Sequence, residues 1–519
     1  MIRISKPRHA ATLIAALLLG SAAGTSAYEA SRGPSQLVHW DHIKAWIGYT
    51  FVKPQRTEGV YLIDMAGQVV NYWPKLTDAY LTEDGTIFGV MGKERGAQRR
   101  SFVEVDWDGK VLWQHTETRP GYSTHHDQLR IYNPKLKEFT VLYIANIDMT
   151  HEEVIELGGD PESKQRYDGS QMDAIVEVDR RGKVVWEWRF RDHLVQDRDP
   201  RKRNYVGKGK TLADHPGRLN INWGVVDKDY IHANGIDYDP KTGHLAISSN
   251  RSFEFYIIDH DGTFVAGNPE ASIALAAGQQ GDFLYRFGNP ANYGQGDHPY
   301  WSAKDWYHLP YSGHRQIGGN HDIQWIKDGL PGAGNLLLFN NGMSVPRTGA
   351  PTRDPQSELL EINPYLDSQG VDRRRYVNPP EAGYTTQLGT GNDASGAPWY
   401  PLTRQYSKQI VWAYRPEDAF VSFHGSGLQR LPNGNTLAEL ARPGRLVEVT
   451  SSGETVWEYV NPITASEGPQ AILVKSRHEN NLAGWSPFRY PANHVALKGK
   501  DLSPKGTVVE YEAARKAAN

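Results

Sequence analysis

Four segments of this sequence carry histidine at the point where a polar turn leads into an apolar strand. Each histidine precedes its strand by a similar margin, so the imidazoles occupy equivalent positions if the segments are structural repeats. One such histidine is more often structural than functional, but four in the same position indicate a common site. The segments are Thr124-His125-His126-Asp127, Tyr230-Ile231-His232-Ala233-Asn234, Asn320-His321-Asp322 and Phe423-His424-Gly425-Ser426.

Clustered imidazoles support three kinds of chemistry. Neutral imidazole binds zinc, copper, iron or nickel. Because imidazole titrates near neutral pH, it also serves as a general acid, a general base or a nucleophile. With an arginine alongside, it holds an anionic group through charge-assisted hydrogen bonds. Arg347 follows His321 in a loop just beyond Gly342, and we expect this loop to return to the same end of the molecule.

Repeated β-hairpins are the elements that must position these residues. In each repeat, alternating apolar residues lead into an acidic or polar turn with glycine, and a β-branched pair then closes on tryptophan. Alternation with a period of two on both sides of a glycine turn predicts a hairpin. Full copies span residues 60–73, 103–113, 176–186 and 447–457, and degenerate copies start at Tyr256 and Leu359 and close at residues 283–287 and 409–414.

A second repeated pattern, glycine before an apolar strand, lies between the hairpins at residues 84–88, 334–339 and 431–437. One strand pair and one hairpin make a four-stranded unit, and six units fit the 519 residues. Such a sheet cannot bury both of its faces alone, so we expect the units to stack around an axis. The sequence therefore predicts an all-β fold, a six-bladed β-propeller with the active site in the central channel. Two stacked β-sandwiches are the alternative, but the recurring tryptophan argues against them.

The composition narrows the classes of partner. Lys and Arg number 57 against 60 Asp and Glu, a net charge of -3, which gives no electrostatic case for nucleic acid or an anionic membrane as partner. The 51 glycines and 31 prolines suit many short strands joined by tight turns. The chain has no cysteine, which excludes thiol catalysis, thiolate metal ligands and lipoprotein acylation and leaves the fold to be held by its core.

The N-terminus has the three parts of a secretory signal peptide. Arg3, Lys6 and Arg8 form a positive region, residues 10–19 are apolar, and small residues lead to Ala27. The apolar stretch is short for a spanning helix, although an uncleaved anchor is the alternative. We therefore predict a periplasmic or secreted protein that is soluble once mature. The predicted division is a signal peptide at 1–27, an N-terminal extension at 28–58 and a propeller at 59–519.

Several longer segments point to a known family. They include His232-Ala-Asn-Gly-Ile-Asp-Tyr238, Ser248-Ser249-Asn-Arg251, Gly281-Asp-Phe-Leu-Tyr-Arg-Phe-Gly-Asn-Pro290, His321-Asp-Ile-Gln-Trp-Ile326, Pro331-Gly-Ala-Gly-Asn-Leu-Leu-Leu-Phe-Asn-Asn-Gly342 and Gln429-Arg-Leu-Pro-Asn-Gly-Asn-Thr-Leu437. In these strings the sequence resembles the bacterial arylsulfate sulfotransferase family. The resemblance covers roughly residues 60–500.

The resemblance implies a six-bladed periplasmic propeller that moves a sulfuryl group between phenols without a cofactor or a nucleotide donor. Its partners would be a small aryl sulfate and a phenolic acceptor. Carried over by position, His424 would be the histidine that is sulfated transiently, and His232, His321 and Arg347 would grip the sulfate. Cationic donors would stabilise charge on the peripheral oxygens, and the covalent intermediate predicts ping-pong kinetics. We also expect substrate contacts from His126, Asn234 and Asp322.

The sequence departs from the family pattern in several places. About thirty residues separate the signal from the first hairpin, where the best known members carry a β-sandwich, and their cysteine pair is absent. The spacing from His321 to Arg347 is loose, so Arg315 and Arg353 are alternatives for the arginine. His424 aligns only by its distance to the strand that follows it.

Two other functions stay open from the residues alone. In a metal-dependent lyase or lactonase, the imidazoles of His126, His232, His321 and His424 would be ligands together with Asp127 or Asp322. In a non-catalytic binding propeller, replacing His424 would change no turnover. Fold and function diverge often enough that both alternatives compete with sulfuryl transfer.

Overall fold

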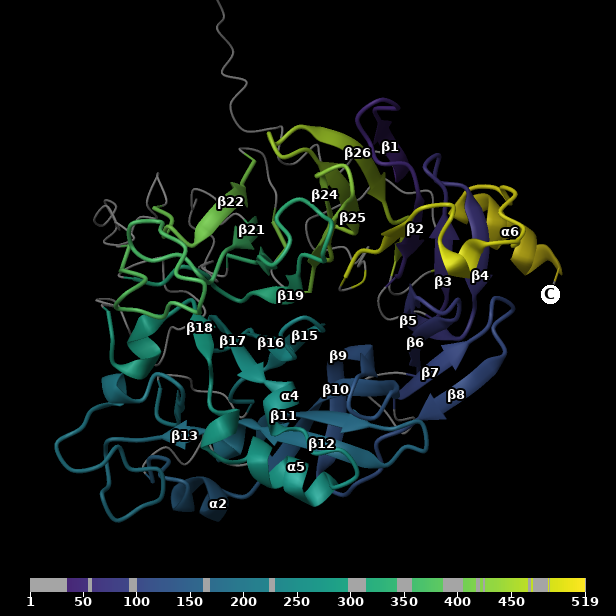
Figure 1. The fold of residues 1–519 in the computed structure, drawn as a ribbon. Coiled ribbons are helices and arrows are strands. Elements are labelled where there is room, and N and C mark those ends of the chain that lie inside the picture. The colour runs from purple at the N-terminus through teal and green to yellow at the C-terminus, as the bar shows by residue number, and fades with distance from the viewer. Residues whose placement is uncertain are drawn as a thin grey trace, which may run out of the picture.

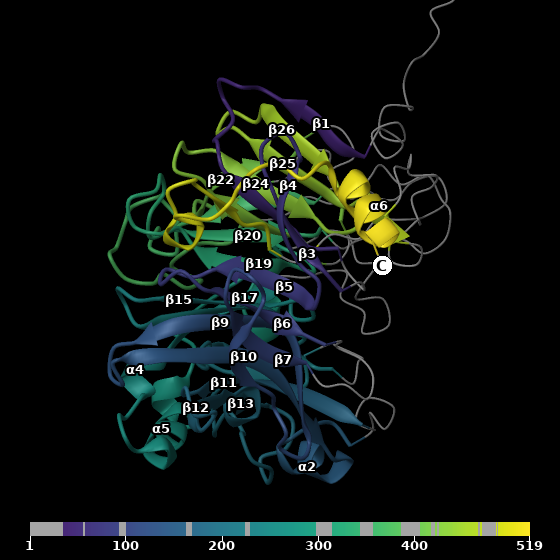
Figure 2. The same ribbon diagram turned by 90° about the vertical axis from the view of Figure 1, so that its right-hand side faces the viewer.

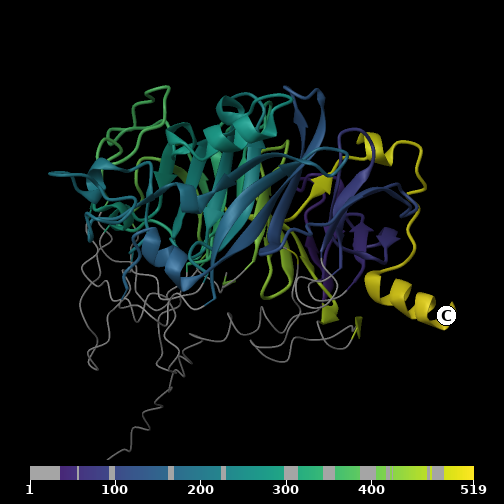
Figure 3. The same cartoon turned by 90° about the horizontal axis from the view of Figure 1, so that it is seen from below.

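The fold is built mainly from β-strands, most of which form six sheets around a common axis, seen end-on in Figure 1 and from the side in Figures 2 and 3. The structure is a computed structural model. The predicted six-bladed β-propeller is confirmed. The structure describes residues 35–54, 58–92, 100–161, 169–223, 229–296, 314–342, 357–385, 405–416, 421–422, 425–464, 468–469, 484 and 486–518.

Each blade is an antiparallel sheet whose strands follow one another from the channel outward. Blade 1 contains β29 (Arg489–Tyr490), β2 (Tyr49–Val52), β3 (Val60–Ile63) and β4 (Val69–Trp73), and blade 2 contains β5 (Leu76–Leu81), β6 (Ile87–Met91), β7 (Ser101–Val105) and β8 (Val111–His115). Blade 3 contains β9 (Tyr122–Asn133), β10 (Glu138–Met149), β11 (Ser170–Val178) and β12 (Val184–Arg189), and blade 4 contains β15 (Ala233–Asp239), β16 (His244–Ser249), β17 (Glu254–Asp259) and β18 (Tyr285–Phe287). Blade 5 contains β19 (His321–Trp325), β20 (Leu336–Asn340), β21 (Glu358–Ile362) and β22 (Ile410–Tyr414), and blade 6 contains β23 (Gly427–Arg430), β24 (Thr436–Leu440), β25 (Arg445–Val449), β26 (Thr455–Val460) and β1 (Gln36–Trp40).

Short helices and two small sheets lie outside the blades. The C-terminal helix α6 packs on blade 1 at the rim of the molecule, where Tyr61 donates a hydrogen bond of 2.8 Å to Glu512 (Figures 1 and 3). The helices are α2 (His151–Glu156), α4 (His260–Thr263), α5 (Pro269–Ala276) and α6 (Val508–Ala518), with 3-10 turns at Phe190–Asp192, Leu212–Asp214, Gln279–Gly281, Pro290–Tyr293 and Val495–Leu497. The small sheets pair β13 (Leu194–Val195) with β14 (Leu219–Asn220) and β27 (Ile463–Thr464) with β28 (Gly468–Pro469).

The hairpin turns form as the repeated phrase predicts. In blade 2, Asp106 Oδ1 accepts the backbone N–H groups of Asp108 and Lys110 at 3.0 and 2.9 Å. Gly109 then takes a φ of 82°, the left-handed conformation in which glycine has no Cβ penalty. The acidic residue and the glycine are therefore both needed to reverse the chain. All six predicted hairpins are present, as β3–β4, β7–β8, β11–β12, β17–β18, β21–β22 and β25–β26.

In blades 2, 5 and 6 the recurring tryptophan joins the blade to the next one. Trp113 donates its indole N–H to the carbonyl of Arg180 in the blade 3 turn at 2.8 Å. Trp412 and Trp457 donate in the same way to Ser451 in blade 6 and Met65 in blade 1, at 2.9 and 3.0 Å. These indole N–H groups thus align the turns of neighbouring blades.

Buried ion pairs also link the blades. A glutamate one residue before the end of the third strand of a blade meets a cation from the next blade. The pairs are Glu104–Arg180, Glu177–His260, Glu361–Arg430 and Glu448–Arg489. Apolar side chains fill the space between the same neighbouring sheets, and six clusters each draw on two adjacent blades. The core thus lies between blades, as expected for sheets that cannot bury both faces alone.

Both ends of the chain close the ring. Strand β1 adds to the outer edge of blade 6, where Trp40 is opposite Trp457. Strand β29, from the C-terminal segment, pairs with β2 of blade 1 and places Tyr490 opposite Tyr49. Residues 28–58, set apart from the propeller in the sequence-based division, therefore contribute two strands to blades.

Candidate active site in the central channel

The inner strands of three blades begin with irregular pairing where the histidines stand. Between β9 and β10 the pairing skips residues 125–127, and between β19 and β20 it shifts between His321 and Gln324. Between β15 and β16 it shifts between Ala233 and Gly235. A bulge of this kind turns side chains out of the alternation of the strand, which aims them at the channel.

The backbone at these positions is strained. His126, His232 and Asp322 have φ values of 51°, 52° and 55°, in the left-handed region that a residue with a Cβ seldom adopts. Such conformations cost about 1–3 kcal/mol each and persist where the surroundings impose them, frequently at functional sites. Three strained residues from three blades at one end of the inner strands mark this place as a candidate site.

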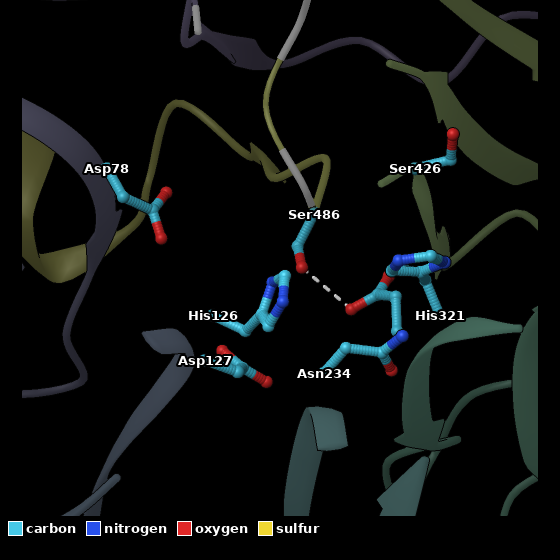
Figure 4. A pocket seen from close by; sticks show the side chains of 8 residues that line it. Asp78, His126, Asp127, Asn234, His321, Ser426 and Ser486 are labelled. Atoms are coloured by element: carbon cyan, nitrogen blue, oxygen red, sulfur yellow. Dashed lines mark hydrogen bonds between the residues drawn. The ribbon is translucent and has the colours of Figure 1, made fainter. Parts of the chain in front are cut away.

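A small pocket lies between these strands in the channel (Figure 4). Its lining is almost wholly polar and comes from strands far apart in the sequence. The residues are Asp78, His126, Asp127, Asn234, His321, Asp322, Ser426 and Ser486.

Two of the histidines share a hydrogen bond. Nε2 of His126 and Nε2 of His232 lie 3.0 Å apart, so one nitrogen must carry a proton and the other must not. His232 Nδ1 also contacts Asp229 Oδ2, and the backbone N–H of His232 donates to the other oxygen of that carboxylate at 3.1 Å. Burial acts to raise the pKa of Asp229, but the hydrogen bond and charge of His232 outweigh it and lower that pKa to about 2. Asp229 is therefore ionised and keeps a proton on His232 Nδ1.

The third histidine has a different pair of partners. His321 Nδ1 lies 2.8 Å from Asn341 Oδ1, and its Nε2 accepts the backbone N–H of Gly425 at 3.2 Å. The Asn341 amide nitrogen donates to the carbonyls of Ser422 and Gly425, which fixes Oδ1 toward the histidine. His321 is therefore neutral with its proton on Nδ1, and its ring centre lies 6.4 Å from that of His126.

The aspartates around the pocket carry less negative charge than their number suggests. Lys53 forms an ion pair of 2.8 Å with Asp78, and this charge outweighs burial and lowers the pKa of Asp78. Burial raises the pKa of Asp127 to about 8 and that of Asp322 to about 6. At neutral pH Asp127 is therefore mostly protonated, whereas Asp322 is mostly ionised.

Five of the residues predicted for the site come together at the pocket. His126, Asn234, His321 and Asp322 line it, and His232 contacts His126 from behind. Arg315 is fully buried beside the Phe253 ring, 4.8 Å from its centre, and does not line the pocket. His424, Arg347 and Arg353 lie outside the described residues.

The structure adds residues that sequence reasoning did not single out. Asp229 lies three positions before His232, so the short spacing between this carboxylate and the histidine is visible in the sequence. Asp173 lies on β11 and holds His125 Nε2 at 2.7 Å, and no sequence pattern joins these two residues. Ser486 follows the last blade and enters the channel from the C-terminal segment, where its hydroxyl donates to Asp322 at 2.7 Å (Figure 4).

Neither a metal-binding cluster nor a membrane-spanning helix is found in the described residues. They contain no group of three or more histidine, aspartate or glutamate side chains placed to hold a metal ion. In the same part of the chain, no helix has the length and apolar character needed to cross a membrane.

Comparison with known proteins identifies the family. A family model described as Arylsulfotransferase (ASST) matches residues 48–361, more than half of the chain. The chain belongs to this family. Membership in the ASST family supports an arylsulfotransferase activity in general terms. The match includes His126, His232 and His321 and ends before His424.

Solved structures resemble the chain only distantly. A protein of unknown function from Bacteroides caccae has 11% identity and a TM-score of 0.37, covering 86% of this chain and 99% of its own. Hydrazine synthase from Kuenenia stuttgartiensis has 13% identity and a TM-score of 0.31, covering 57% and 66%. Apo AztD from Citrobacter koseri has 9% identity and a TM-score of 0.30, covering 86% and 100%. No curated protein matches the sequence.

Proposed function

We propose that this protein is an exported arylsulfate sulfotransferase that moves a sulfuryl group from an aryl sulfate to a phenol through a sulfohistidine at His424. One observation carries the proposal: three blades of an ASST-family propeller bring His126, His232 and His321 to one polar pocket in the channel. The signal-peptide pattern of residues 1–27 supports export.

The position of His424 in the sequence is consistent with the proposed role. It directly precedes Gly425, whose N–H contacts His321 Nε2. Attack by an imidazole on sulfur would break the S–O bond to the donor phenol and form an N–S bond, and an acceptor phenol would then reverse these changes. Sulfuryl transfer spreads charge over peripheral oxygens, so hydrogen-bond donors fixed around the pocket would stabilise the transition state.

The electrostatics of the pocket support binding of a singly charged sulfate ester. Lys53 offsets Asp78, and Asp127 is mostly uncharged at neutral pH. For His321 to grip a sulfate oxygen, its Nε2 must release Gly425 and gain a proton. Substrate binding would thus be coupled to the segment that carries His424.

The purified protein should be incubated with 4-nitrophenyl sulfate, with and without phenol, while nitrophenol release and the intact mass are followed. We expect release that depends on phenol, and a mass gain of one SO₃ group that maps to His424 when phenol is withheld. The His424→Asn variant should lose both signals, since no other group would accept the sulfuryl. Absence of nitrophenol release and of the mass gain in the wild-type protein would refute the proposal.

A further inference from the structure

The carboxylate behind the paired histidines has no role in the function proposed above. Asp229 bonds both the side chain and the backbone of His232, whose own φ lies in the left-handed region. These two contacts fix the ring from behind and leave Nε2 directed at His126. The ordering Asp229, His232, His126 therefore runs from the wall of the channel to the pocket.

The proton positions along this chain follow from the contacts. Asp229 accepts from His232 Nδ1–H, so the neutral His232 ring has a bare Nε2. His126 Nε2 must then donate its hydrogen to His232 across the 3.0 Å contact. Burial, and next the neighbouring His232, lowers the pKa of His126 well below its usual value, so His126 is neutral between turnovers. It is suited to pass a proton onward rather than to store it.

Carboxylates and cations both surround the paired histidines. Asp229 contacts His232, and Asp173 holds His125, whose ring centre lies 6.0 Å from that of His232. On the other side, Asp127 lines the pocket next to His126, and Arg100 donates to the His126 carbonyl at 2.8 Å. Arg251 acts on Asp229 from the end of β16, and His321 lies beyond His126. A carboxylate in direct contact with Nδ1 compensates a positive charge on the His232 ring.

We propose that Asp229 is a positioning residue and that His126 and His232 form a proton relay for the phenolic acceptor. The inference rests on the proposed sulfuryl transfer. The acceptor O–H gives its proton to Nδ1 of His126, while Nε2–H of His126 passes to Nε2 of His232. The phenolate oxygen forms the O–S bond as the N–S bond of the sulfohistidine breaks, and the freed histidine keeps the electron pair. To reset the relay, His232 returns its Nε2 proton to Nε2 of His126, and His126 releases the acceptor proton from Nδ1 to solvent. Asp229 stays ionised throughout, and both rings regain their original tautomers.

The relay predicts that the effect of replacing Asp229 or His126 on the transfer rate depends on whether the acceptor phenol is protonated. An acceptor phenol that is protonated at the assay pH must lose a proton, whereas a nitrophenolate has none to lose. A positioned general base contributes a factor of about 10² to 10⁴. Loss of Asp229 should therefore slow transfer to the first kind of acceptor much more than to the second.

The test compares Asp229→Asn, His126→Gln and the double variant in transfer from the sulfurylated protein to phenol and to a nitrophenolate. We expect each variant to lose about 100-fold with phenol and no more than about 5-fold with the nitrophenolate. The double variant should resemble the single variants, because the residues act as one unit. In the pH profile for phenol, the wild-type rate should fall at low pH as the relay histidines become protonated, and the variants should lose this acidic limb.

Asp282→Asn is the matched control. Asp282 holds His193 Nδ1 at 2.8 Å, a pair of the same kind outside the pocket, so this variant should transfer at the wild-type rate to both acceptors. Denaturation midpoints of all variants show whether they fold. Equal losses with both acceptors, or no loss, would overturn the relay while leaving sulfuryl transfer intact. A wild-type protein that never becomes sulfurylated would overturn both.

Discussion

The partners of each ring nitrogen decide what a histidine in this channel can do. His232 Nδ1 is held by the carboxylate of Asp229, whereas His321 Nδ1 is held by the amide oxygen of Asn341. Asn341 is almost fully buried and also bonds the carbonyls of Ser422 and Gly425. One side chain thus fixes the His321 tautomer and the backbone on both sides of residues 423–424.

Replacing Asn341 with Leu should lower kcat/KM for sulfuryl transfer by about 100-fold, because misplacement of a reacting group by about 1 Å costs that much. The variant should also unfold more easily, since two carbonyls lose their donor. Steady-state kinetics and urea denaturation check this.

Asn378→Leu is the control for that variant. Asn378 bridges Leu284 and Arg286 outside the pocket, so its loss should reduce stability alone. A fall in kcat/KM of the same size in both variants would show that the effect of Asn341 comes from lost stability and not from its contacts at the site.

Paired strands form the blades of this propeller. Buried polar groups between neighbouring blades hold the blades in alignment. Glu177 on β11 is fully buried and accepts from Asn133, Thr140 and the His260 ring of blade 4. Burial disfavours the charged His260, but Glu177 and Asp261 outweigh it and raise the pKa of His260 to about 9. The interface between blades 3 and 4 therefore contains a protonated histidine at neutral pH.

This pair makes the stability of the protein depend on pH. Because the pKa of His260 rises on folding from 6.5 to about 9, its contribution is complete below pH 6.5 and is lost as the pH rises through about 9. The full contribution is about 3 kcal/mol of unfolding free energy. Urea denaturation between pH 6 and 10 should show this loss in the wild-type protein and a flatter curve in His260→Gln. Parallel curves for the two proteins would contradict the assignment.

At the scale of the whole molecule, closure of the ring depends on contacts between the two ends of the chain. Arg489 on β29 pairs with Glu448 of blade 6, donates to Thr50 of blade 1 at 2.8 Å, and lies 4.3 Å from the Trp457 ring centre. Both members of the ion pair are buried. A chain without disulfides thus uses a buried guanidinium to join its first and last blades.

Arg489→Leu should lower the free energy of unfolding by about 3–5 kcal/mol, because Glu448 would keep a buried charge without a partner. The double variant Arg489→Leu with Glu448→Gln should lose less, since Gln can still accept from Trp46 and Asn435 without a charge. Chemical denaturation of the three proteins measures both effects. If the double variant were as unstable as the single one, the buried charge would not be the cause.

The sequence by itself was enough to predict the repeated hairpins and the position of the candidate site in the channel. Hairpins follow from local alternation and from the turn formed by residues such as Asp106 and Gly109, because these preferences act over a few residues. Six repeats then imply a propeller, and equivalent positions in it imply that His126, His232 and His321 converge. The sequence also pointed to the ASST family that the comparison confirmed.

Only the tertiary structure decided which partners surround those histidines. Asp173 reaches His125 across 48 residues within the sheet of blade 3, and Ser486 reaches Asp322 across 164 residues through closure of the ring. No local pattern marks either contact. The state of Asp127 likewise depends on burial, which raises its pKa, and burial is a property of packed blades. Local periodicity determines which residues lie on the inner strands. The protonation state of their side chains depends on neighbours that only the folded sheets and the closed ring bring close.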